Sequence, residues 1–226
     1  MRGIASWFAV LLSVCLFAWG APWRAEETPG WHSLFDGESF EGWKVNENPD
    51  TFSIKDGAIV AAGPRSHLFY VGPVQNGRFK NFELKVEVMT KPNSNGGIFF
   101  HTGFQDAGWP SRGYEVQVNN SFPPDYRRTG SLYGVVDIRE APAQDNVWFT
   151  EHIIVCGRRV LIKVDGKTQV DWTEPADLKL RDGQQGRRLS AGTFALQGHD
   201  PGSMVLYRNI RVKPLPDDAK CEEVVQ

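Results

Sequence analysis

One stretch of the sequence decides the fold class: Phe82-Glu83-Leu84-Lys85-Val86-Glu87-Val88. Apolar residues occupy every second position, and charged residues occupy the positions between them. Successive side chains of a β-strand point to opposite faces, so this alternation predicts a strand with one face buried and the other in water. No long stretch of the 226 residues has the 3.6-residue apolar period of an amphipathic helix.

The same alternation recurs along the chain. Val160, Ile162 and Val164 alternate with Leu161 and Lys163, and Asp165-Gly166 supplies the geometry of a tight hairpin turn into residues 169–172. Further strands are predicted at residues 52–54, 58–61, 68–71, 98–101, 114–118, 132–136, 152–156, 192–197 and 205–212. Short strands separated by Gly, Pro, Asn and Asp turns are typical of two packed antiparallel sheets. We therefore predict an all-β jelly-roll sandwich.

The ends of the chain differ from its centre. Arg2 precedes an apolar run over residues 4–18 and then small residues, which is typical of a secretory signal peptide. We expect residues 1–21 to be removed and the protein to be secreted or periplasmic, with no stable membrane insertion afterwards. An uncleaved anchor is the alternative, but the run is short for a bilayer span. Residues 30–216 are expected to form one domain, and residues 217–226 a loose C-terminal tail.

The net charge and the cysteine content indicate which classes of binding partner are not expected. The formal net charge is −2, which gives no electrostatic reason to expect nucleic acid or an anionic membrane as a partner. Cys15 lies in the predicted signal peptide, and neither Cys156 nor Cys221 belongs to a metal-type cluster. Free or weakly paired thiols are the default expectation, although pairing of these two cysteines is left open.

Polar residues alternate with valines at residues 114–119. If Val116 and Val118 face the core, Glu115, Gln117 and Asn119 point together from the opposite face, about 7 Å apart along the strand. Acid, amide and amide side chains flanked by long loops indicate a binding or catalytic surface. An ordinary solvated strand face is the alternative.

A second polar stretch follows Phe194 and Leu196. With these two residues inward, Gln197 and His199 face outward, and the histidine lies at a strand end where it can reach a ligand. Histidine is readily tuned to exchange a proton near neutral pH. Asp200-Pro201-Gly202 is alternatively only a turn that His199 precedes.

Aromatic, arginine and amide side chains add a third signal. The loops and strands of the central region carry Trp109, Phe122, Tyr126, Arg127, Arg128 and Tyr133. Aromatic rings stack on the apolar faces of sugar rings, and planar polar groups bind the hydroxyls, so a carbohydrate would suit this set. Asn95 precedes two glycines that would let a ligand approach the backbone. His101 is a second titrating candidate, with a hydrogen-bonded structural histidine as the alternative.

Several familiar catalytic signatures are missing. The sequence has no Gly-x-Ser-x-Gly elbow, no Walker loop and no His-Glu-x-x-His motif. It also has no closely spaced Glu-x-Asp-x-x-Glu of the kind found in concanavalin-like retaining glucanases. Ordinary hydrolysis of glycosides by two carboxylates is therefore weakly supported.

Seven segments in a fixed order resemble the 3-keto-disaccharide hydrolase family from about residue 30 to residue 215. They are Leu34-Phe35-Asp36-Gly37 with Gly42-Trp43, Asn81-Phe82-Glu83-Leu84, Asn95-Gly96-Gly97-Ile98-Phe99-Phe100, Gly113-Tyr114-Glu115-Val116-Gln117, Thr129-Gly130-Ser131-Leu132-Tyr133-Gly134, Leu196-Gln197-Gly198-His199 and Arg208-Asn209-Ile210-Arg211. Two departures concern subfamily and substrate: Gly96 replaces a common serine, and Trp148-Phe149 replaces a common Trp-Asn pair. The resemblance implies a concanavalin-like jelly roll, a bacterial exported protein, and action on glycosides whose C3 hydroxyl has been oxidised to a ketone.

The implied reaction assigns roles to these residues. A C3 ketone acidifies the C2 proton, so a base can remove it, the enolate expels the C1 substituent, and water adds to the enone. Either His199 or Glu115 would be the base and the other the acid. The remaining candidates are Gln117, Gln197 and Asn95 as donors, His101, Asp200 and Tyr133 in secondary catalytic roles, and Asn119, Trp109 and Arg128 in substrate binding.

Three points stay open at this level. No cofactor is expected, although a divalent cation held by Glu115, His199 and a neighbour would also stabilise an enolate. A non-catalytic carbohydrate-binding module of the same fold is the main rival, because fold does not settle function. A structural domain whose loops contact other proteins is a third possibility.

Overall fold

The computed structural model of the protein describes residues 29–180 and 182–224. The predicted signal peptide, residues 1–21, lies outside these residues. Within the described part of the chain, no helix combines the length and the apolar character needed to span a membrane.

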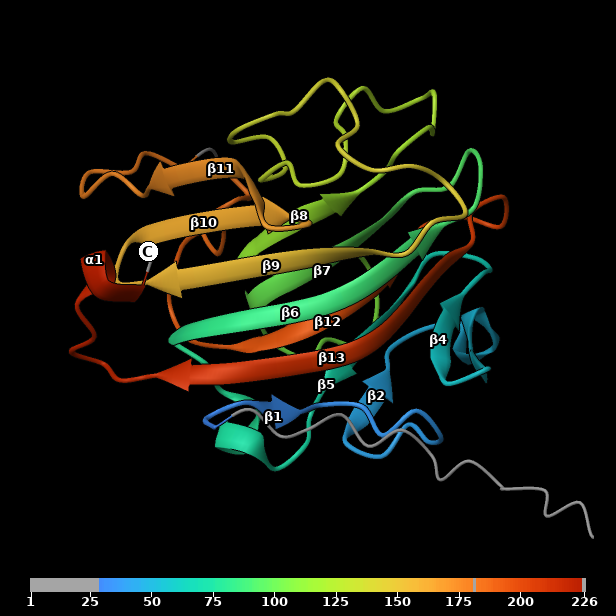
Figure 1. Cartoon of the computed structure of the whole chain (residues 1–226), viewed down its shortest axis with the longest axis horizontal. Helices are drawn as coiled ribbons and strands as arrows, with labels where there is room; N and C mark the ends of the chain where they lie inside the picture. Colours follow the sequence, from blue (N-terminus) through green and yellow to red (C-terminus); the bar gives the residue numbers. More distant parts are fainter. Residues whose placement is uncertain (1–28, 181, 225–226) are drawn as a thin grey trace, which may run out of the picture.

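Two antiparallel sheets make up the fold, and Figure 1 shows the larger one in front of the smaller. The larger sheet has the order β11 (Lys167–Thr173), β10 (Arg159–Val164), β9 (Phe149–Cys156), β6 (Asn81–Thr90), β13 (Val205–Leu215), β4 (Ala58–Ala61) and β3 (Phe52–Lys55), with β1 (His32–Ser33) also on β13. The smaller sheet has the order β2 (Trp43–Val45), β5 (Ser66–Tyr70), β12 (Thr193–Gly198), β7 (Gly96–Thr102) and β8 (Tyr114–Val118). Helical turns are confined to η1 (Pro49–Thr51), η2 (Val74–Gly77) and α1 (Cys221–Val224) within the described residues.

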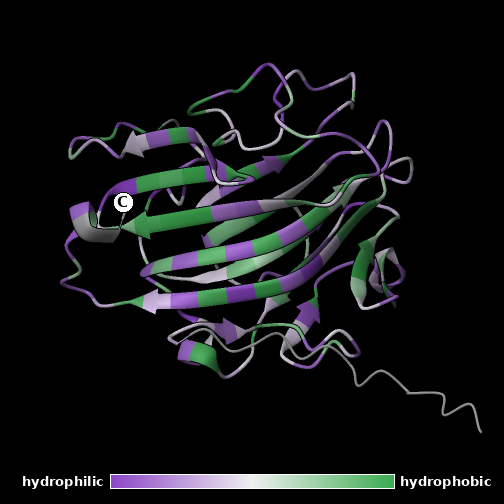
Figure 2. Cartoon of the chain, viewed as in Figure 1, coloured by the Kyte–Doolittle hydropathy of each residue, from purple (hydrophilic) through white to green (hydrophobic). Residues whose placement is uncertain are grey.

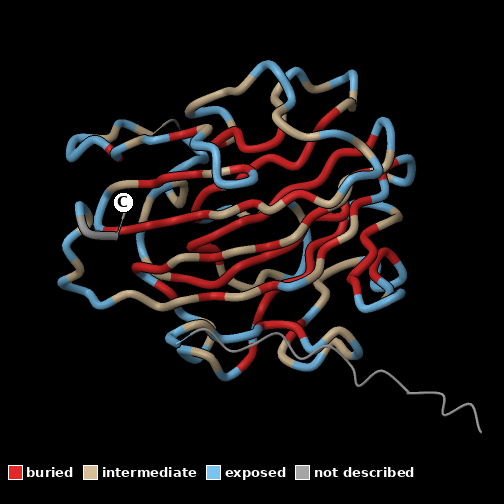
Figure 3. Tube along the Cα trace, in the orientation of Figure 1, coloured by how far each residue is buried: buried red, intermediate tan, exposed pale blue. Residues whose placement is uncertain are grey.

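In β6, buried and partly exposed residues alternate as the sequence predicted. Phe82, Leu84, Val86 and Val88 are buried, and the charged residues between them are partly exposed. The apolar and polar positions alternate along this strand in Figure 2, and the buried ones alternate with partly exposed ones in Figure 3. The core lies between the two sheets, where side chains of both inner faces meet. The prediction of an all-β sandwich of two antiparallel sheets is confirmed.

One predicted strand, residues 132–136, is instead a tight turn. The backbone N–H groups of Leu132 and Val136 donate to each other's carbonyl oxygens, at 3.1 and 3.0 Å. Gly134 has a φ of 65° inside this turn, a conformation that glycine adopts without strain. Its N–H also donates to the Asp137 side chain. These local hydrogen bonds close the chain on itself, so the apolar residues do not extend into a strand.

Cys156 and Cys221 form a disulfide, so the expectation of free or weakly paired thiols is wrong. Cys156 ends β9, and Cys221 begins α1 in the segment that was expected to be a loose tail. The Asn81 side chain donates to the carbonyl oxygen of Pro216 and turns this segment back toward β9. The cysteines are 65 residues apart in sequence, and only this return of the chain brings their Cα atoms within 5.5 Å.

Candidate functional site

The smaller sheet carries polar side chains on the face that points away from the larger sheet. His67 of β5 pairs with Gln197 of β12, and Gly97 of β7 pairs with Gln117 of β8. The register between β12 and β7 joins these pairs into one row across four strands. The neighbouring row on the same face is Phe69, Ala195, Phe99 and Glu115.

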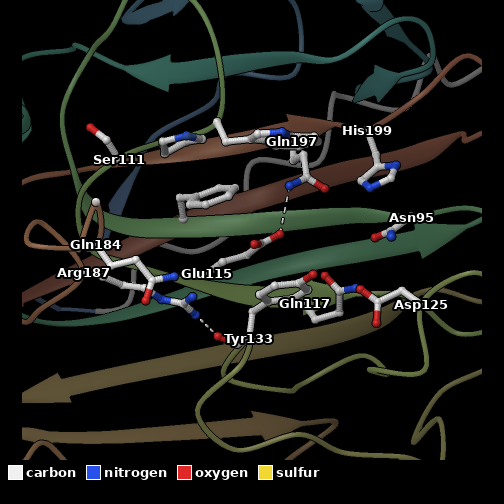
Figure 4. Close-up of a pocket in the computed structure, with 15 residues that line it drawn as sticks. Asn95, Ser111, Glu115, Gln117, Asp125, Tyr133, Gln184, Arg187, Gln197 and His199 are labelled. Carbon is white, nitrogen blue, oxygen red and sulfur yellow. Dashed lines mark hydrogen bonds between the residues drawn. The ribbon is translucent and has the colours of Figure 1, made fainter. Parts of the chain in front are cut away.

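Four residues of these rows, Gln197, Gln117, Phe99 and Glu115, lie on the floor of a pocket of about 340 Å³ (Figure 4). Loops around residues 109–113, 125–133 and 183–187 form its walls. The lining residues are Asn95, Phe99, Trp109, Pro110, Ser111, Gly113, Glu115, Gln117, Asp125, Tyr133, Gly183, Gln184, Arg187, Gln197 and His199. Seven of the residues predicted as functional are in this set: Glu115, His199, Tyr133, Asn95, Gln117, Gln197 and Trp109.

Gly97 allows the two central polar side chains to meet. The Gln197 Nε2 donates a hydrogen bond to Glu115 Oε1 at 2.9 Å, although β7 lies between the strands that carry them (Figure 4). A Cβ atom on Gly97 would collide with the Glu115 carboxylate. Glycine is thus required at this position by close packing, which is one of the uses of glycine inside a strand.

The pKa of Glu115 is well above the usual range for a carboxyl group. Burial raises it to about 8, against the opposing effects of the hydrogen bond from Gln197 and the positive charge of Arg187. The residue still lines the cavity and is only partly covered. Glu115 is therefore mostly protonated at neutral pH, and it can give a proton to a bound ligand.

His199 is held by its neighbour Asp200. The Nδ1 atom of His199 lies 2.7 Å from Asp200 Oδ2, and that carboxylate also accepts hydrogen bonds from Ser203 Oγ and the Gly202 N–H. Burial alone would raise the pKa of Asp200, but these hydrogen bonds outweigh it and lower the pKa. A charged Asp200 keeps the proton of the ring on Nδ1, which leaves Nε2 of His199 available to the pocket.

Three amide groups of the floor have buried atoms without a protein partner. Asn95 Oδ1, Gln117 Nε2 and Gln197 Oε1 make no hydrogen bond within the described part of the chain. Buried polar atoms are nearly always hydrogen-bonded in folded proteins. These acceptors and this donor therefore suit a ligand with several hydroxyl or carbonyl groups.

Aromatic side chains line the pocket together with these amide groups. Trp109 is 46% exposed, and its ring lies 5.5 Å from the rings of both His67 and His199. Burial lowers the pKa of His67 to about 4, so this ring is neutral and supports the tryptophan as a packing partner. Phe99 and Tyr133 complete an apolar and aromatic lining of the kind that stacks on sugar rings.

His101 does not lie in the pocket. It is buried, its Nε2 lies 2.9 Å from the carbonyl oxygen of Lys80, and its Nδ1 accepts from the Ser190 N–H. Burial lowers its pKa to about 4. It therefore has the hydrogen-bonded structural role that the sequence left as an alternative.

Asn119 and Arg128 also lie outside the pocket, where they shape the loop that carries Asp125. Asn119 is fully buried, and its Nδ2 donates to the carbonyl oxygens of Asp125 and Arg127. Arg128 donates to Asn119 Oδ1 and to the carbonyl oxygens of Phe122 and Asp125. The side chains of Asn119 and Arg128 make their hydrogen bonds to the backbone and side chains of this loop, and these bonds hold Asp125 at the pocket wall.

Sequence reasoning missed Asp125, Arg187, Gln184, Ser111 and Phe99 in the lining. Only Phe99 had a signal, because it follows Asn95 and Gly97 at a spacing of two residues along one strand. The others come from loops, where no periodicity tells which side chain faces the site.

A cation site is not evident in the described residues, where no group of three or more His, Cys, Asp or Glu side chains could hold a metal ion. The carboxyl groups that line the pocket belong to Glu115 and Asp125, and each of them already has a partner in the protein. Glu115 accepts from Gln197, and Asp125 lies 3.3 Å from the Arg127 guanidinium.

Known proteins resemble this chain in fold and in sequence. A candidate glycosyl hydrolase from Parabacteroides distasonis superposes with a TM-score of 0.70 at 20% identity, covering 83% of this chain and 94% of that one. The endo-β-1,3(4)-glucanase SCLam of family GH16 gives a TM-score of 0.50 at 12% identity, covering 83% and 92%. These likenesses confirm the concanavalin-like jelly roll.

Sequence comparison adds the family. A 3-keto-disaccharide hydrolase from Bacteroides thetaiotaomicron is 31% identical over 86 residues, which are 33% of this chain and 28% of that protein. The model of the 3-keto-alpha-glucoside-1,2-lyase-like domain matches residues 30–213, which include every lining residue of the pocket. With most of its length matched, this chain belongs to the 3-keto-alpha-glucoside-1,2-lyase-like domain family, as the order of its sequence segments predicted.

Proposed function

We propose that this protein is an exported enzyme that cleaves 3-keto-glycosides, including 3-keto-disaccharides, by elimination and hydration. The observation that carries the proposal is the pairing of two different proton-exchanging groups in one polar pocket. Glu115 is mostly protonated there, and His199 is held by Asp200 with Nε2 available. The family of carbohydrate-active, hydrolase-like proteins supports the same chemistry.

The first half of the reaction removes the leaving group. His199 Nε2 takes the C2 proton, and the electrons of that C–H bond move toward the C3 oxygen, which becomes an enolate oxygen. The electrons then return to form a C1–C2 double bond while the bond from C1 to the leaving oxygen breaks. Glu115 gives its proton to that oxygen. This step leaves an enone, an imidazolium at His199 and a carboxylate at Glu115.

The second half restores both groups. Water adds to C1 of the enone, the Glu115 carboxylate takes one proton of the water, and the His199 imidazolium returns a proton to C2. The sum of the two halves is hydrolysis of the glycoside. The protonated state of Glu115 supports it as the acid and His199 as the base, which the sequence had left undecided.

The pocket floor suits the substrate proposed. The free acceptor and donor atoms of Asn95, Gln117 and Gln197 are available to the ring hydroxyls and the C3 ketone. Trp109 offers a partly exposed ring for stacking on the sugar. Export, through the signal peptide expected in residues 1–21, would place the enzyme where extracellular glycosides are degraded.

The test is release of a chromogenic aglycone from 3-keto-glucosides by the purified protein. Glu115→Gln and His199→Ala should each lose about 10²- to 10⁴-fold in turnover. Both variants should still bind the unoxidised glucoside. His32→Ala, at an exposed histidine of β1, is the matched control and should keep native turnover.

The remaining outcomes separate the rival functions. Binding of sugars without release from any 3-keto-glycoside would overturn the proposal in favour of a carbohydrate-binding module. Loss of turnover in a chelator, restored by a divalent cation, would assign enolate stabilisation to a metal instead of the amides.

A further inference from the structure

Arg187 is the arginine among the residues that line the pocket. The Nη2 atom of Arg187 donates to the backbone carbonyl oxygen of Tyr133, which is uncharged (Figure 4). Within the described residues, none of the ion pairs includes this guanidinium. A guanidinium has five N–H donors, so further donors remain for a ligand. By contrast, Arg127 lies within 3.3 Å of both Asp125 and Asp137.

The loop of Arg187 is fastened to the strand that carries Glu115. The Gly113 N–H donates to the Gly186 carbonyl oxygen at 2.9 Å, and Gly113 directly precedes β8. Two residues after Arg187, the Leu189 N–H donates to Glu174 Oε2 at 2.8 Å. The same oxygen accepts from the Tyr114 hydroxyl at 2.7 Å. Arg187 is thus held between two anchors that both lead to β8.

Glu174 is well placed for this anchoring role. It is only 8% exposed, and its Oε2 joins Tyr114, the neighbour of Glu115, to the loop of Arg187. Arg187 and Glu115 line the same pocket (Figure 4), and the positive charge of Arg187 acts to lower the pKa of the Glu115 carboxyl group.

We propose that Arg187 contacts the substrate and holds the C3 oxygen as that oxygen becomes an enolate, and that Glu174 is the positioning residue that sets Arg187 in place. This inference rests on the proposed function. Arg187 donates hydrogen bonds to the oxygen and transfers no proton. Its charge faces the negative charge that develops when the electrons of the C2–H bond move to the C3 oxygen. Donors aimed at such a developing charge act more strongly on the transition state than on the bound substrate.

The first test compares turnover of 3-keto-glucosides by Arg187→Met, Arg187→Lys and Arg188→Met. Arg188 is the exposed neighbour that does not line the pocket, so its variant is the control. Arg187→Met should lower kcat by about 10²- to 10³-fold with a smaller change in KM. Arg187→Lys should recover part of this loss. A kcat for Arg187→Met within about threefold of native would overturn the role of Arg187.

The role of Glu174 is tested by a double-mutant cycle. Glu174→Ala removes the acceptor of the hydrogen bonds from the Leu189 N–H and the Tyr114 hydroxyl, and it should lower kcat. Glu174→Gln keeps an acceptor oxygen and should lose less. In the Arg187→Met background, Glu174→Ala should cause no further loss of kcat, because the residue it positions is already absent. Equal losses in both backgrounds would overturn the positioning role and leave Glu174 a purely structural residue.

A titration separates failure of this inference from failure of the proposed function. The pKa of the Glu115 carboxyl, followed by carbon-13 NMR, should rise in Arg187→Met and stay native in Arg188→Met, since removing a nearby cation disfavours the carboxylate. No turnover by the native protein would overturn the reaction. An unchanged Glu115 pKa in folded Arg187→Met, or in Arg187→Gln if the first variant does not fold, would overturn the placement of Arg187 alone.

Discussion

Glu115 and Glu151 lie on different sheets, and burial raises the pKa of each to about 8. Glu115 lies on β8, faces the pocket and accepts a hydrogen bond from Gln197. Glu151 lies on β9, is fully buried, and neither of its carboxyl oxygens makes a hydrogen bond with the described residues. The Gly130 N–H near it opposes the shift. The two residues share a titration property but differ in access and in partners.

The comparison shows that a raised pKa does not by itself identify a catalytic acid. Along β9, Phe149, Glu151, Ile153 and Val155 are buried in alternation, so Glu151 occupies a core position where an apolar residue is expected. Its carboxyl group is neutral because charge is costly in such surroundings. Glu115 combines the same neutrality with an open cavity and a fixed orientation, and these two features make proton transfer to a ligand feasible.

The largest expected effect separates the two residues by turnover. Glu115→Gln removes the proposed acid and should lower turnover of a 3-keto-glucoside by about 10²- to 10⁴-fold. Glu151→Gln replaces a neutral carboxyl group by a neutral amide at a residue that does not line the pocket, so turnover should stay native. Steady-state kinetics of the two purified variants measures the contrast. Equal losses in both would break the distinction drawn from access to the pocket.

The next effect concerns stability against pH. A carboxyl group whose pKa is raised in the folded state binds more protons there than in the unfolded chain between about pH 4.5 and 8, so the free energy of unfolding falls as pH rises through this window. Each pKa unit corresponds to about 1.4 kcal/mol. At about pH 9, Glu151→Gln should therefore raise the free energy of unfolding by up to about 4 kcal/mol relative to the native protein. Denaturant unfolding of native and variant protein at acidic and alkaline pH tests this. A variant as pH-dependent as the native protein would assign the window to other groups.

The adjacent glycines Gly96 and Gly97 give a smaller contrast of the same kind. A Cβ on Gly97 would displace the Glu115 carboxylate on the pocket side, and a misplacement of about 1 Å can cost 10²-fold in rate, so Gly97→Ala should lose turnover on that scale. A Cβ on Gly96 would approach the Tyr207 hydroxyl on the core side, so Gly96→Ala should lose about 1–3 kcal/mol of stability instead. Kinetics and thermal unfolding of both variants test the assignment, which would fail if the two effects were exchanged.

The smallest expected effect is the pH profile of turnover. Because the proposed acid must be protonated, kcat/KM should fall above about pH 8, by about tenfold per pH unit, as Glu115 loses its proton. Glu151→Gln should keep this alkaline limb in place. If Glu151→Gln instead changed the pH at which kcat/KM falls, the group that titrates in the native profile would be Glu151.

Much of the fold and part of the site were predictable from local patterns. The alternation in β6 indicated a half-buried strand, and the spacing of two residues placed Glu115 with Gln117 and Gln197 with His199 on common faces. Such periodicity follows from the geometry of a single strand and needs no knowledge of its neighbours. The order of the short motifs was enough to identify the family, because that order depends on the sequence alone.

Contacts between distant segments were decided only by the tertiary structure. The register across β12, β7 and β8 gave Gly97 its role, and the return of the chain to β9 paired Cys156 with Cys221. Loops without periodicity brought Arg187 and Asp125 to the pocket. His101 of β7 is instead buried, with its ring hydrogen-bonded to the backbone of Lys80 and Ser190. By itself the sequence determined which faces of individual strands are polar. Which of those faces meet, and which loops cover them, depends on pairing and packing between residues far apart in the chain, so only the tertiary structure decided it.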